Sequence, residues 1–299
     1  MTEPFRTGFV TLLGRPNVGK STLLNRMVGQ KVSITSPRPQ TTRHRILGIR
    51  TDAVSQVVFV DTPGLHHAQQ RVMGQAMYRA AVGSLEGVDL VLLLIGASGW
   101  TEGDEFALQQ LRNQACPVIL VINKIDRVKD KARLLPLMQL SSEKYPFAEI
   151  VPVSAQKGDN LDALERAIVR HLPEGAPGFP ADQITDRGDR FTAAEFIREQ
   201  LFRRLQQEIP YSLAVEIQQW QRTPTLLRIE AVIWVEKAGQ KAIVIGKDGA
   251  GLKAIGQRAR LEMERRFGCK VYLGLWVKVR AGWADNVTAL RALGYLEEQ

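Results

Sequence analysis

Residues 14–21 read Gly-Arg-Pro-Asn-Val-Gly-Lys-Ser, which matches the pattern G-x-x-x-x-G-K-[ST]. The pattern follows the apolar run Phe9–Leu13 and precedes a helical pattern, so it predicts a phosphate-binding loop between a buried strand and a helix. Glycine lets the backbone wrap closely around phosphates, with N–H groups and the helix N-terminus facing the negative charge. The expected nucleotide contacts are Gly14, Arg15, Pro16, Asn17, Val18, Gly19, Lys20, Ser21 and Thr22.

The first part of the chain alternates short apolar runs with helical patterns. This alternation indicates βαβ units, and continuous apolar runs are typical of parallel strands that helices cover on both faces. The expected strands are Phe9–Leu13, Val57–Val60, Leu90–Ile95, Val118–Ile122 and Ile150–Val153. We therefore predict an α/β domain with a mainly parallel sheet.

The sequence Asn123-Lys124-Ile125-Asp126 predicts which base the nucleotide carries. It stands at the carboxyl end of an expected strand, where open α/β sheets bind ligands. The Asp126 carboxylate can accept hydrogen bonds from the N1–H and the exocyclic amine of guanine, and adenine offers no such pair of donors. Ser154 and Ala155 follow the last expected strand, and the Ala155 N–H is expected to bind guanine O6. The motif therefore predicts a guanine nucleotide, GTP or GDP.

Two further segments predict the phosphate and metal contacts. Asp61-Thr62-Pro63-Gly64 follows a strand, and we expect Asp61 to help anchor Mg²⁺ and the Gly64 N–H to contact the γ-phosphate. The polar, proline-containing segment Ser36–Arg43 is expected to close on Mg²⁺ only when the γ-phosphate is present. Thr42 is preferred over Thr41 as its ligand. The expected metal-site residues are Ser21, Thr42 and Asp61.

The length of 299 residues favours two domains, because single domains usually have roughly 100–200 residues. The segment Glu174–Arg190 is rich in glycine and proline and has no apolar periodicity, which indicates a linker. We expect a nucleotide-binding domain over residues 1–173, the linker over 174–190 and a second domain over 191–299.

Beyond the linker the periodicity changes. Helical spacing over 194–205 is followed by alternating strands over 213–217 and 227–235, a helix over 252–263 and a third alternating strand over 271–279. Alternation of apolar and polar residues indicates strands with one covered face. The second domain is therefore expected to be α+β.

A G-x-x-G pattern in the second domain, Gly246-Lys247-Asp248-Gly249, stands after two strands and before a helix. This order is typical of a KH domain, in which small residues let a nucleic-acid backbone approach closely. Residues 237–280 carry 11 Lys and Arg against three acidic residues, so the region suits a polyanion. Trp276 and Trp283 are expected to be core or packing residues, with stacking platforms for bases as the less favoured alternative. The expected RNA-binding residues are Gly246, Lys247, Asp248, Gly249, Lys253 and Arg258.

Charge, cysteine content and the absence of long apolar runs indicate the kind of partner and the cellular compartment of the protein. The net charge of +9 favours a polyanionic partner. A basic surface that only contacts solvent would give the same net charge. Cys116 and Cys269 have no metal-ligand spacing and are expected to be reduced thiols of a cytoplasmic protein. The first residues carry no signal-peptide pattern, and the longest apolar run is too short to span a bilayer.

Several motifs together carry a family resemblance: Gly14–Ser21, Gln40–His44, Asp61–Gly64, Asn123–Asp126, Ser154-Ala155, Ile245–Gly249, Leu275–Val279 and Gly282–Asp285. In this combination the chain resembles the bacterial Era GTPases from about Thr7 to Leu296. The resemblance implies a Ras-like G domain followed by a type II KH domain. It also implies a GTP-hydrolysing switch that binds small-subunit (16S) ribosomal RNA near its 3′ end and acts in 30S subunit assembly. Peripheral association with the inner membrane is implied as well, and we expect a monomer with no obligate protein partner.

One departure from Ras-type enzymes affects the expected mechanism. Leu65 follows the Asp61–Gly64 motif, where Ras-type enzymes place the glutamine that orients the attacking water. Leucine forms no hydrogen bond through its side chain, so another device must act. Related GTPases with asparagine at the Asn17 position use a bound K⁺, and we expect K⁺ here. The residues expected to act in hydrolysis are Lys20, Thr42, Asn17 and Gly64.

A rival interpretation is an RNA chaperone or assembly module in which GTP mainly stabilises the fold. A tRNA-modification GTPase is disfavoured because the C-terminal cysteine motif of that class is absent from the sequence. A single G-x-x-x-x-G-K-[ST] pattern excludes the tandem-G-domain ribosome GTPases.

Overall fold

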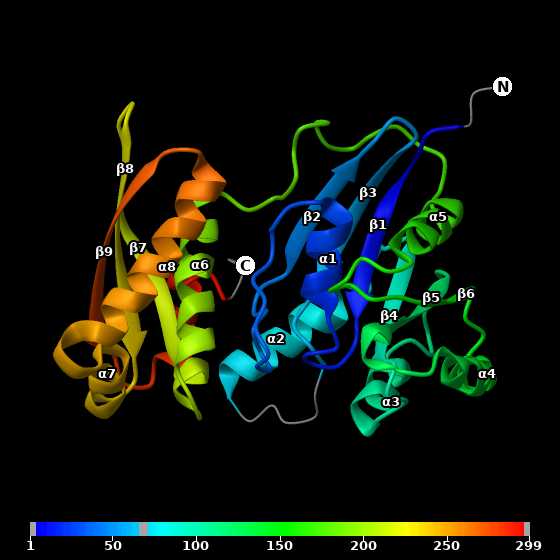
Figure 1. Ribbon diagram of the computed structural model, residues 1–299, viewed down its shortest axis with the longest axis horizontal. Coiled ribbons are helices and arrows are strands. Elements are labelled where there is room, and N and C mark those ends of the chain that lie inside the picture. The colour runs from blue at the N-terminus through cyan, green and yellow to red at the C-terminus, as the bar shows by residue number, and fades with distance from the viewer. Residues whose placement is uncertain (1–3, 66–70, 296–299) are drawn as a thin grey trace. The chain divides into compact units, whose positions relative to one another are not determined.

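The computed structural model describes residues 4–65 and 71–295. The chain divides into two compact units between Asp186 and Arg187, and two earlier segments, Ser36–Thr41 and residues 71–76, are grouped with the second unit. Each unit has its own sheet, and each is described separately below. Figure 1 labels the elements along the chain.

The first unit contains a six-stranded sheet in the order β2-β3-β1-β4-β5-β6. Its strands are β1 (Arg6–Leu13), β2 (Ile46–Thr51), β3 (Ser55–Asp61), β4 (Leu90–Gly96), β5 (Val118–Asn123) and β6 (Glu149–Pro152). All neighbours pair in parallel except β2 and β3, which form an antiparallel hairpin. The five expected strands and the mainly parallel sheet are confirmed, and β2 is an additional edge strand.

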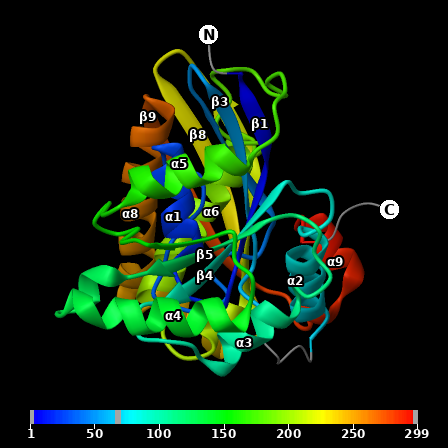
Figure 2. The ribbon, with the colours of Figure 1, turned by 90° about the vertical axis from the view of Figure 1, so that its right-hand side faces the viewer.

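Helices cover both faces of this sheet (Figure 1 and Figure 2). The helices α1 (Lys20–Val28) and α5 (Leu161–His171) share one core with the sheet, and α2 (Val72–Gly83), α3 (Glu102–Gln109) and α4 (Leu134–Lys144) share the other. Because both faces are buried, the strands β3, β4 and β5 are apolar almost without interruption and buried throughout. The parallel strands bring their carboxyl ends, and hence the predicted motifs, to one edge.

The segment expected as a linker lies in part along the first unit. The buried Gln56 amide holds it, accepting from the N–H groups of Gly178 and Phe179 at 2.7 and 2.9 Å and donating to the Phe179 carbonyl at 2.8 Å. Farther on, the Ile49 N–H donates to the Ile184 carbonyl at 2.9 Å. The Gln56 side chain and this backbone hydrogen bond thus tie residues 178–184 to β3 and β2.

The second unit has the helix–strand–strand–helix–helix–strand order of a type II KH domain. Its regular elements are α6 (Asp189–Arg204), β7 (Leu213–Arg222), β8 (Leu226–Val235), α7 (Ala238–Ile245), α8 (Ala250–Phe267), β9 (Lys270–Val279) and α9 (Val287–Ala292). The sheet order is β7-β8-β9, with β7 antiparallel and β9 parallel to β8. Helices α6 and α8 pack on one face of this sheet (Figure 1). The α+β fold predicted for this half is confirmed.

Local sequence explains the helix ends in this unit. Helix α8 buries Ile255, Ala259 and Met263, which recur every four residues, and it ends at Gly268, whose φ of 65° is a left-handed conformation that favours glycine. The Gln240 side chain caps α7 by accepting from the N–H groups of Glu236 and Lys237 at 2.9 and 3.0 Å. These caps fix where α7 begins and where α8 ends.

Candidate guanine-nucleotide site and RNA-binding loop

The loop between β1 and α1 requires its two glycines. Gly14 has φ +148°, and a Cβ there would lie 2.6 Å from the Leu94 carbonyl oxygen. Gly19 has φ +113°, and a Cβ there would lie 2.2 Å from Nδ2 of Asn123. Val18 is fully buried in the core and anchors the loop. The backbone between them therefore curves tightly at the carboxyl edge of the sheet, as a phosphate-binding loop does.

Lys20 is held inside this loop. Its ammonium donates to the carbonyls of Gly14 and Arg15 at 2.9 and 3.2 Å, and its side chain is buried. Burial lowers the pKa of Lys20 from 10.5 to about 8, although the charge of Asp61 opposes this shift. A buried cation beside a nest of backbone N–H groups is suited to the negative charge of nucleotide phosphates.

Hydroxyl groups from three segments converge on the Asp61 carboxylate. Its Oδ2 accepts from Ser21 at 2.7 Å, from Ser33 at 2.8 Å and from Thr42 at 3.3 Å, and the Ser21 and Thr42 hydroxyls lie 2.8 Å apart. Burial raises the pKa of Asp61, and these hydrogen bonds oppose the rise. Its buried Oδ1 has no hydrogen-bond partner among the residues described. A carboxylate and hydroxyls are the hard oxygen donors that Mg²⁺ prefers, so the residues fit that ion.

The two candidate threonines of the Ser36–Arg43 segment have different partners. Thr41 contacts its own segment, with its hydroxyl donating to the Arg38 carbonyl at 2.8 Å and lying 2.7 Å from that of Ser36. Thr42 instead contacts Ser21 and Asp61. The geometry favours Thr42 for the metal site. Ser33, which shares Asp61, carried no motif signal in the sequence.

The Asp61–Gly64 segment lies directly against the phosphate loop. The Thr62 hydroxyl donates to the Leu12 carbonyl at 2.9 Å, and a Cβ on Gly64 would lie 2.6 Å from the Pro16 nitrogen. Pro63 stands between them as a buried residue. Leu65 is 1% exposed and belongs to the core that α2 and α3 share with the sheet. The Leu65 side chain therefore points away from solvent.

Arg15 and Asn17 differ in how firmly they are held. Arg15 donates from Nε to both oxygens of Asp104 at 3.1 and 3.2 Å, and Asp104 is fully buried at the start of α3. Asn17 is exposed, with a φ of 60° in the left-handed region. Thr22 lies in the first turn of α1 and is half-buried.

The predicted base-recognition residues come together at the ends of β5 and β6. The Asn123 amide donates to the Val18 carbonyl at 2.9 Å and accepts from the Ala155 N–H at 3.0 Å, which links this motif to the phosphate loop. The Lys124 ammonium donates to the Asn17 carbonyl. The Ser154 hydroxyl donates to Oδ1 of Asp126 at 2.6 Å and orients that carboxylate. The Ala155 N–H, expected to bind guanine O6, thus already donates to Asn123.

The Gly246–Gly249 loop has a different character. Gly246 and Gly249 have φ of 72° and 77°, and Asp248 between them has φ 50°. A Cβ on Gly249 would meet no atom within 4 Å, so the loop leaves open space beside it. The side chains of Lys247, Asp248, Lys253 and Arg258 are exposed, and none bonds to a described residue. The loop therefore offers its backbone and a set of unneutralised cations.

The two tryptophans expected in the core have different environments. Trp283 is fully buried, and its indole N–H donates to the Ser212 carbonyl at 3.3 Å, which confirms the prediction. Trp276 is 46% exposed, so it does not lie in the core, although its ring packs over Gly274. It stands at an even position of β9, on the face away from the helices, whereas the odd positions Val271 and Val277 are buried.

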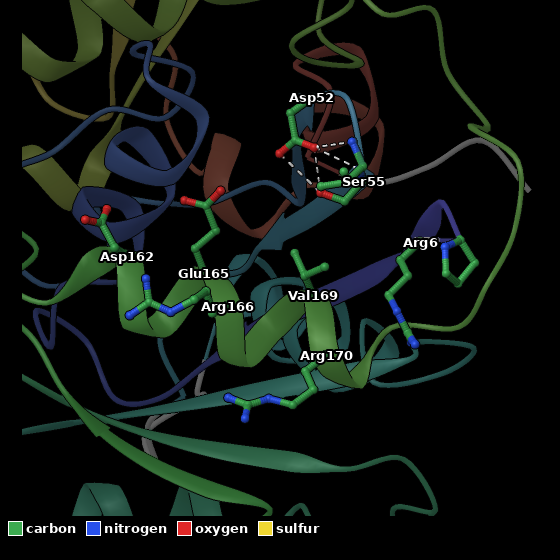
Figure 3. A pocket seen from close by; sticks show the side chains of 10 residues that line it. Arg6, Asp52, Ser55, Asp162, Glu165, Arg166, Val169 and Arg170 are labelled. Carbon is green, nitrogen blue, oxygen red and sulfur yellow. Dashed lines mark hydrogen bonds between the residues drawn. The ribbon is translucent and has the colours of Figure 1, made fainter. Parts of the chain in front are cut away.

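A groove of about 860 Å³ lies beside the amino end of β1, away from the phosphate loop (Figure 3). The polar groups that line it are largely committed to structure. Asp52 caps the turn by accepting from the N–H groups of Val54 and Ser55 at 2.9 and 2.8 Å, and Arg6 donates to the Leu172 carbonyl at 2.5 Å. Glu165 pairs with Arg50. These contacts explain the groove as the junction of β1, the β2–β3 turn and α5.

Two family models match the chain: a 50S ribosome-binding GTPase model over residues 9–124 and a KH-domain model over residues 208–284. GTPase Era of Stenotrophomonas maltophilia strain K279a is 57% identical over 292 residues, covering 98% of each chain. GTPase Era of Xanthomonas axonopodis pv. citri strain 306 is 55% identical over 295 residues, covering 99% of each. Both likenesses run through both units.

Two solved structures resemble the whole chain. One is Era in complex with MgGDPNP and nucleotides 1506–1542 of 16S ribosomal RNA, with a TM-score of 0.95 and 44% identity over 98% of this chain and 100% of that one. The other is a variant of Aquifex aeolicus Era bound to GDP·AlF4⁻, with the same TM-score, identity and coverage. Among residues 4–65 and 71–295, no helix is long and apolar enough to cross a membrane.

Proposed function

The chain belongs to the Era family of GTPases, and on that premise we propose that it is a GTP-hydrolysing switch that binds 16S ribosomal RNA and acts in 30S subunit assembly. The observation that carries the proposal is the combination, in one chain, of a guanine-type nucleotide site with an exposed G-x-x-G loop on a KH fold. The Era structure that contains a 16S RNA fragment supports the choice of RNA. We propose residues 1–173 as the G domain, 174–190 as the linker and 191–299 as the KH domain.

In the proposed site, the chain binds the nucleotide through two rigidly held regions. The backbone of the Gly14–Ser21 loop and the Lys20 ammonium bind the phosphates, and Asp126, oriented by Ser154, accepts from the guanine edge. The Ala155 N–H donates a bifurcated hydrogen bond, to guanine O6 and to the Asn123 side-chain oxygen. The hydrogen bonds from Asn123 and Lys124 to carbonyls of the phosphate-binding loop keep the base-binding and phosphate-binding residues at a fixed separation.

We propose Ser21, Thr42 and Asp61 as the residues that hold Mg²⁺, with Ser33 orienting the Asp61 carboxylate. When bound, Mg²⁺ neutralises charge that develops on the phosphates. Thr42 ties the Ser36–Arg43 segment to this site, so the position of that segment depends on which nucleotide is present. Gly64, pressed against Pro16, contributes its N–H to the γ-phosphate.

Hydrolysis in this site proceeds without a glutamine after Gly64. Leu65 is buried in the core, so the attacking water is oriented by backbone groups and by the closed Ser36–Arg43 segment. We propose that K⁺ binds beside the exposed, left-handed Asn17 and supplies positive charge that an arginine finger provides in other GTPases. We further propose a cytoplasmic monomer that associates peripherally with the inner membrane, without an obligate protein partner.

RNA binding is assigned to the loop and to the cations that follow it: Gly246, Lys247, Asp248, Gly249, Lys253 and Arg258. The small residues let the RNA backbone approach, and Lys247, Lys253 and Arg258 neutralise phosphates. Crosslinking the protein to total cellular RNA and sequencing the crosslinked sites tests the assignment. We expect enrichment near the 3′ end of 16S RNA, and sites scattered among unrelated RNAs would contradict it.

A further inference from the structure

One face of the KH sheet presents aromatic and basic side chains instead of a core. Odd-numbered residues of β8, such as Ile229 and Ile233, are fully buried beneath the helices. The even-numbered positions of β8 and β9, continued by residue 280 directly after β9, lie on the opposite face of the sheet. We define the aromatic face by these even-numbered residues: Trp234, Tyr272, Trp276, Arg228, Lys278 and Arg280.

Trp276 is one of two exposed aromatic side chains on the aromatic face. A Cβ on Gly274 would lie 2.9 and 3.1 Å from Cη2 and Cζ3 of the Trp276 ring, so the ring leans along β9 over this glycine. Val232, its partner on β8, is 1% exposed, whereas Trp276 remains 46% exposed. The glycine thus lets the indole lie along the sheet, with nearly half of its surface open to solvent.

Tyr272 extends the same platform along β9. It is 47% exposed and lies four residues before Trp276, about 13 Å away at the roughly 3.3 Å rise of a strand. The Arg228 guanidinium stands 4.9 Å from the Tyr272 ring centre and pairs with Glu230 at 2.9 Å. This spacing along the strand leaves room for different bases on the two rings.

Cations at the other end of the aromatic face are available to phosphates. Lys278 and Arg280 lie 5.9 and 6.0 Å from the Trp234 ring centre, and neither forms an ion pair with a described carboxylate. The acidic residues on this face are already engaged: Glu216 accepts from the Trp234 indole N–H at 2.7 Å, and Glu230 pairs with Arg228. Because Arg228, Lys278 and Arg280 outnumber Glu216 and Glu230, the net charge of these residues is positive.

We propose that the aromatic face is a second contact surface for single-stranded RNA, on which a base stacks on Trp276 while Lys278 and Arg280 neutralise phosphates. RRM domains bind RNA by stacking bases on aromatic side chains of an open sheet face. Nearby cations add electrostatic attraction to the phosphates of the RNA backbone. The choice of RNA as the partner rests on the proposed function, but the surface is separate from the Gly246–Gly249 loop. An RNA longer than the loop site would reach both surfaces.

The test compares two unstructured RNAs in the full-length protein at matched salt. One has about four nucleotides, which a G-x-x-G loop clamps, and the other is roughly three times longer. Trp276→Ala should weaken the longer RNA roughly 5- to 150-fold, the effect of losing one base–aromatic stack, and leave the shorter RNA unchanged. Trp276→Phe should retain most of the affinity. Gly249→Asp should weaken both RNAs.

Two further variants complete the design. Lys278→Ala should weaken the longer RNA and reduce the slope of log K against log salt by about 1. Val279→Ala is the matched control, because Val279 is 45% exposed on the same strand at an odd position. It should bind both RNAs as the unchanged protein does. If Trp276→Ala fails to fold, Lys278→Ala decides the result through its salt slope and its affinity for the longer RNA.

Unchanged affinity for the longer RNA in both Trp276→Ala and Lys278→Ala would overturn the proposal and leave a protein as the partner of this face. Equal losses for both RNAs in Trp276→Ala would also overturn it, since Trp276 would then act through the loop. If Gly249→Asp binds normally while Trp276→Ala does not, the aromatic face stands and the proposed loop function fails. The two failures are therefore distinguishable.

Discussion

The nucleotide site and the G-x-x-G loop recognise charged ligands with opposite designs. Around the phosphate loop, Asp61 is fully buried, Asn123 is 2% exposed and Lys20 is 6% exposed, and each is hydrogen-bonded to a neighbouring segment. Around the glycine loop, the side chains of Lys247 and Lys253 are exposed and form no bond with the described residues.

This difference predicts different kinds of selectivity. Groups held rigidly out of water discriminate by hydrogen-bond geometry, because a wrong ligand leaves them buried and unpaired. Exposed cations attract any polyanion, with an affinity that falls steeply as salt rises. We therefore expect nucleotide binding by the G domain to be specific and insensitive to salt, and RNA binding by the KH loop to weaken steeply as salt rises.

The largest effect is expected at the guanine site. Asp126→Asn replaces an acceptor with a group that also donates, so GTP is rejected and xanthine nucleotides are accepted. The preference for GTP over XTP should fall by about 10⁴, the penalty typical of an unmatched buried polar group. Competition binding with labelled GTP and XTP measures it. Full GTP affinity without any gain in XTP binding would contradict base selection by Asp126, and with it the specificity expected of the nucleotide site.

The next effect is expected at the glycine loop. Gly249→Asp introduces a side chain and a negative charge at a residue whose φ is 77°, so both strain and repulsion oppose RNA. RNA affinity should fall at least about 100-fold. The circular dichroism spectrum should remain that of a folded protein, and the basal rate of GTP hydrolysis should stay within a few-fold of the rate of the unchanged protein. Gly239→Asp, in the exposed first turn of α7, offers a charge-matched control. A titration that shows unchanged RNA affinity would remove the loop from the RNA site.

A smaller effect is expected from the monovalent cation. Because Leu65 is buried in the core and orients no water, the turnover rate should rise roughly tenfold when K⁺ replaces Na⁺. This increase is smaller than the rate factor of about 10²–10³ that one oxyanion-hole donor supplies. Asn17→Ala should remove this difference and leave nucleotide binding largely intact. Equal turnover of the unchanged protein in the two salts would contradict a K⁺ site.

The smallest effect concerns pH. Burial lowers the pKa of Lys20 to about 8, and bound phosphates favour the ammonium, so nucleotide binding takes up a proton above pH 8. GTP affinity should be nearly constant below about pH 7 and fall about twofold by pH 8 and about fourfold by pH 8.5, with a limit of tenfold per pH unit. Calorimetry in buffers of different ionisation enthalpy reports the proton directly. A flat affinity without proton uptake would contradict a buried, titrating Lys20.

Patterns confined to neighbouring residues predicted much of this molecule. The continuous runs at Val57–Val60 and Val118–Ile122 became buried parallel strands, since a two-sided core requires such runs. The spacing of Ile255, Ala259 and Met263 likewise gave the buried face of α8. In each case the local pattern and the tertiary environment agree.

Features that depend on distant partners were not predictable. The edge strand β2 (Ile46–Thr51) is defined by pairing with β3, and Ser33 is distinguished only by its contact with Asp61. Helix α7 (Ala238–Ile245) has no counterpart among the expected elements, because the short apolar run 242–245 does not by itself distinguish a helix from a strand. Trp276 could not be assigned to a face, because an aromatic residue in an alternating strand has the same local pattern on either face.

The central claim is that the buried nucleotide site and the exposed RNA loop act together in one switch. Multiple-turnover phosphate release, measured with and without saturating 16S 3′-end RNA, tests it most directly, with Gly249→Asp as the comparison. We predict repeated turnover that changes in rate when RNA is added to the unchanged protein and does not change in Gly249→Asp. Release that stops after one turnover, or a rate that RNA leaves unaltered, would contradict the claim and favour a chaperone in which GTP serves the fold.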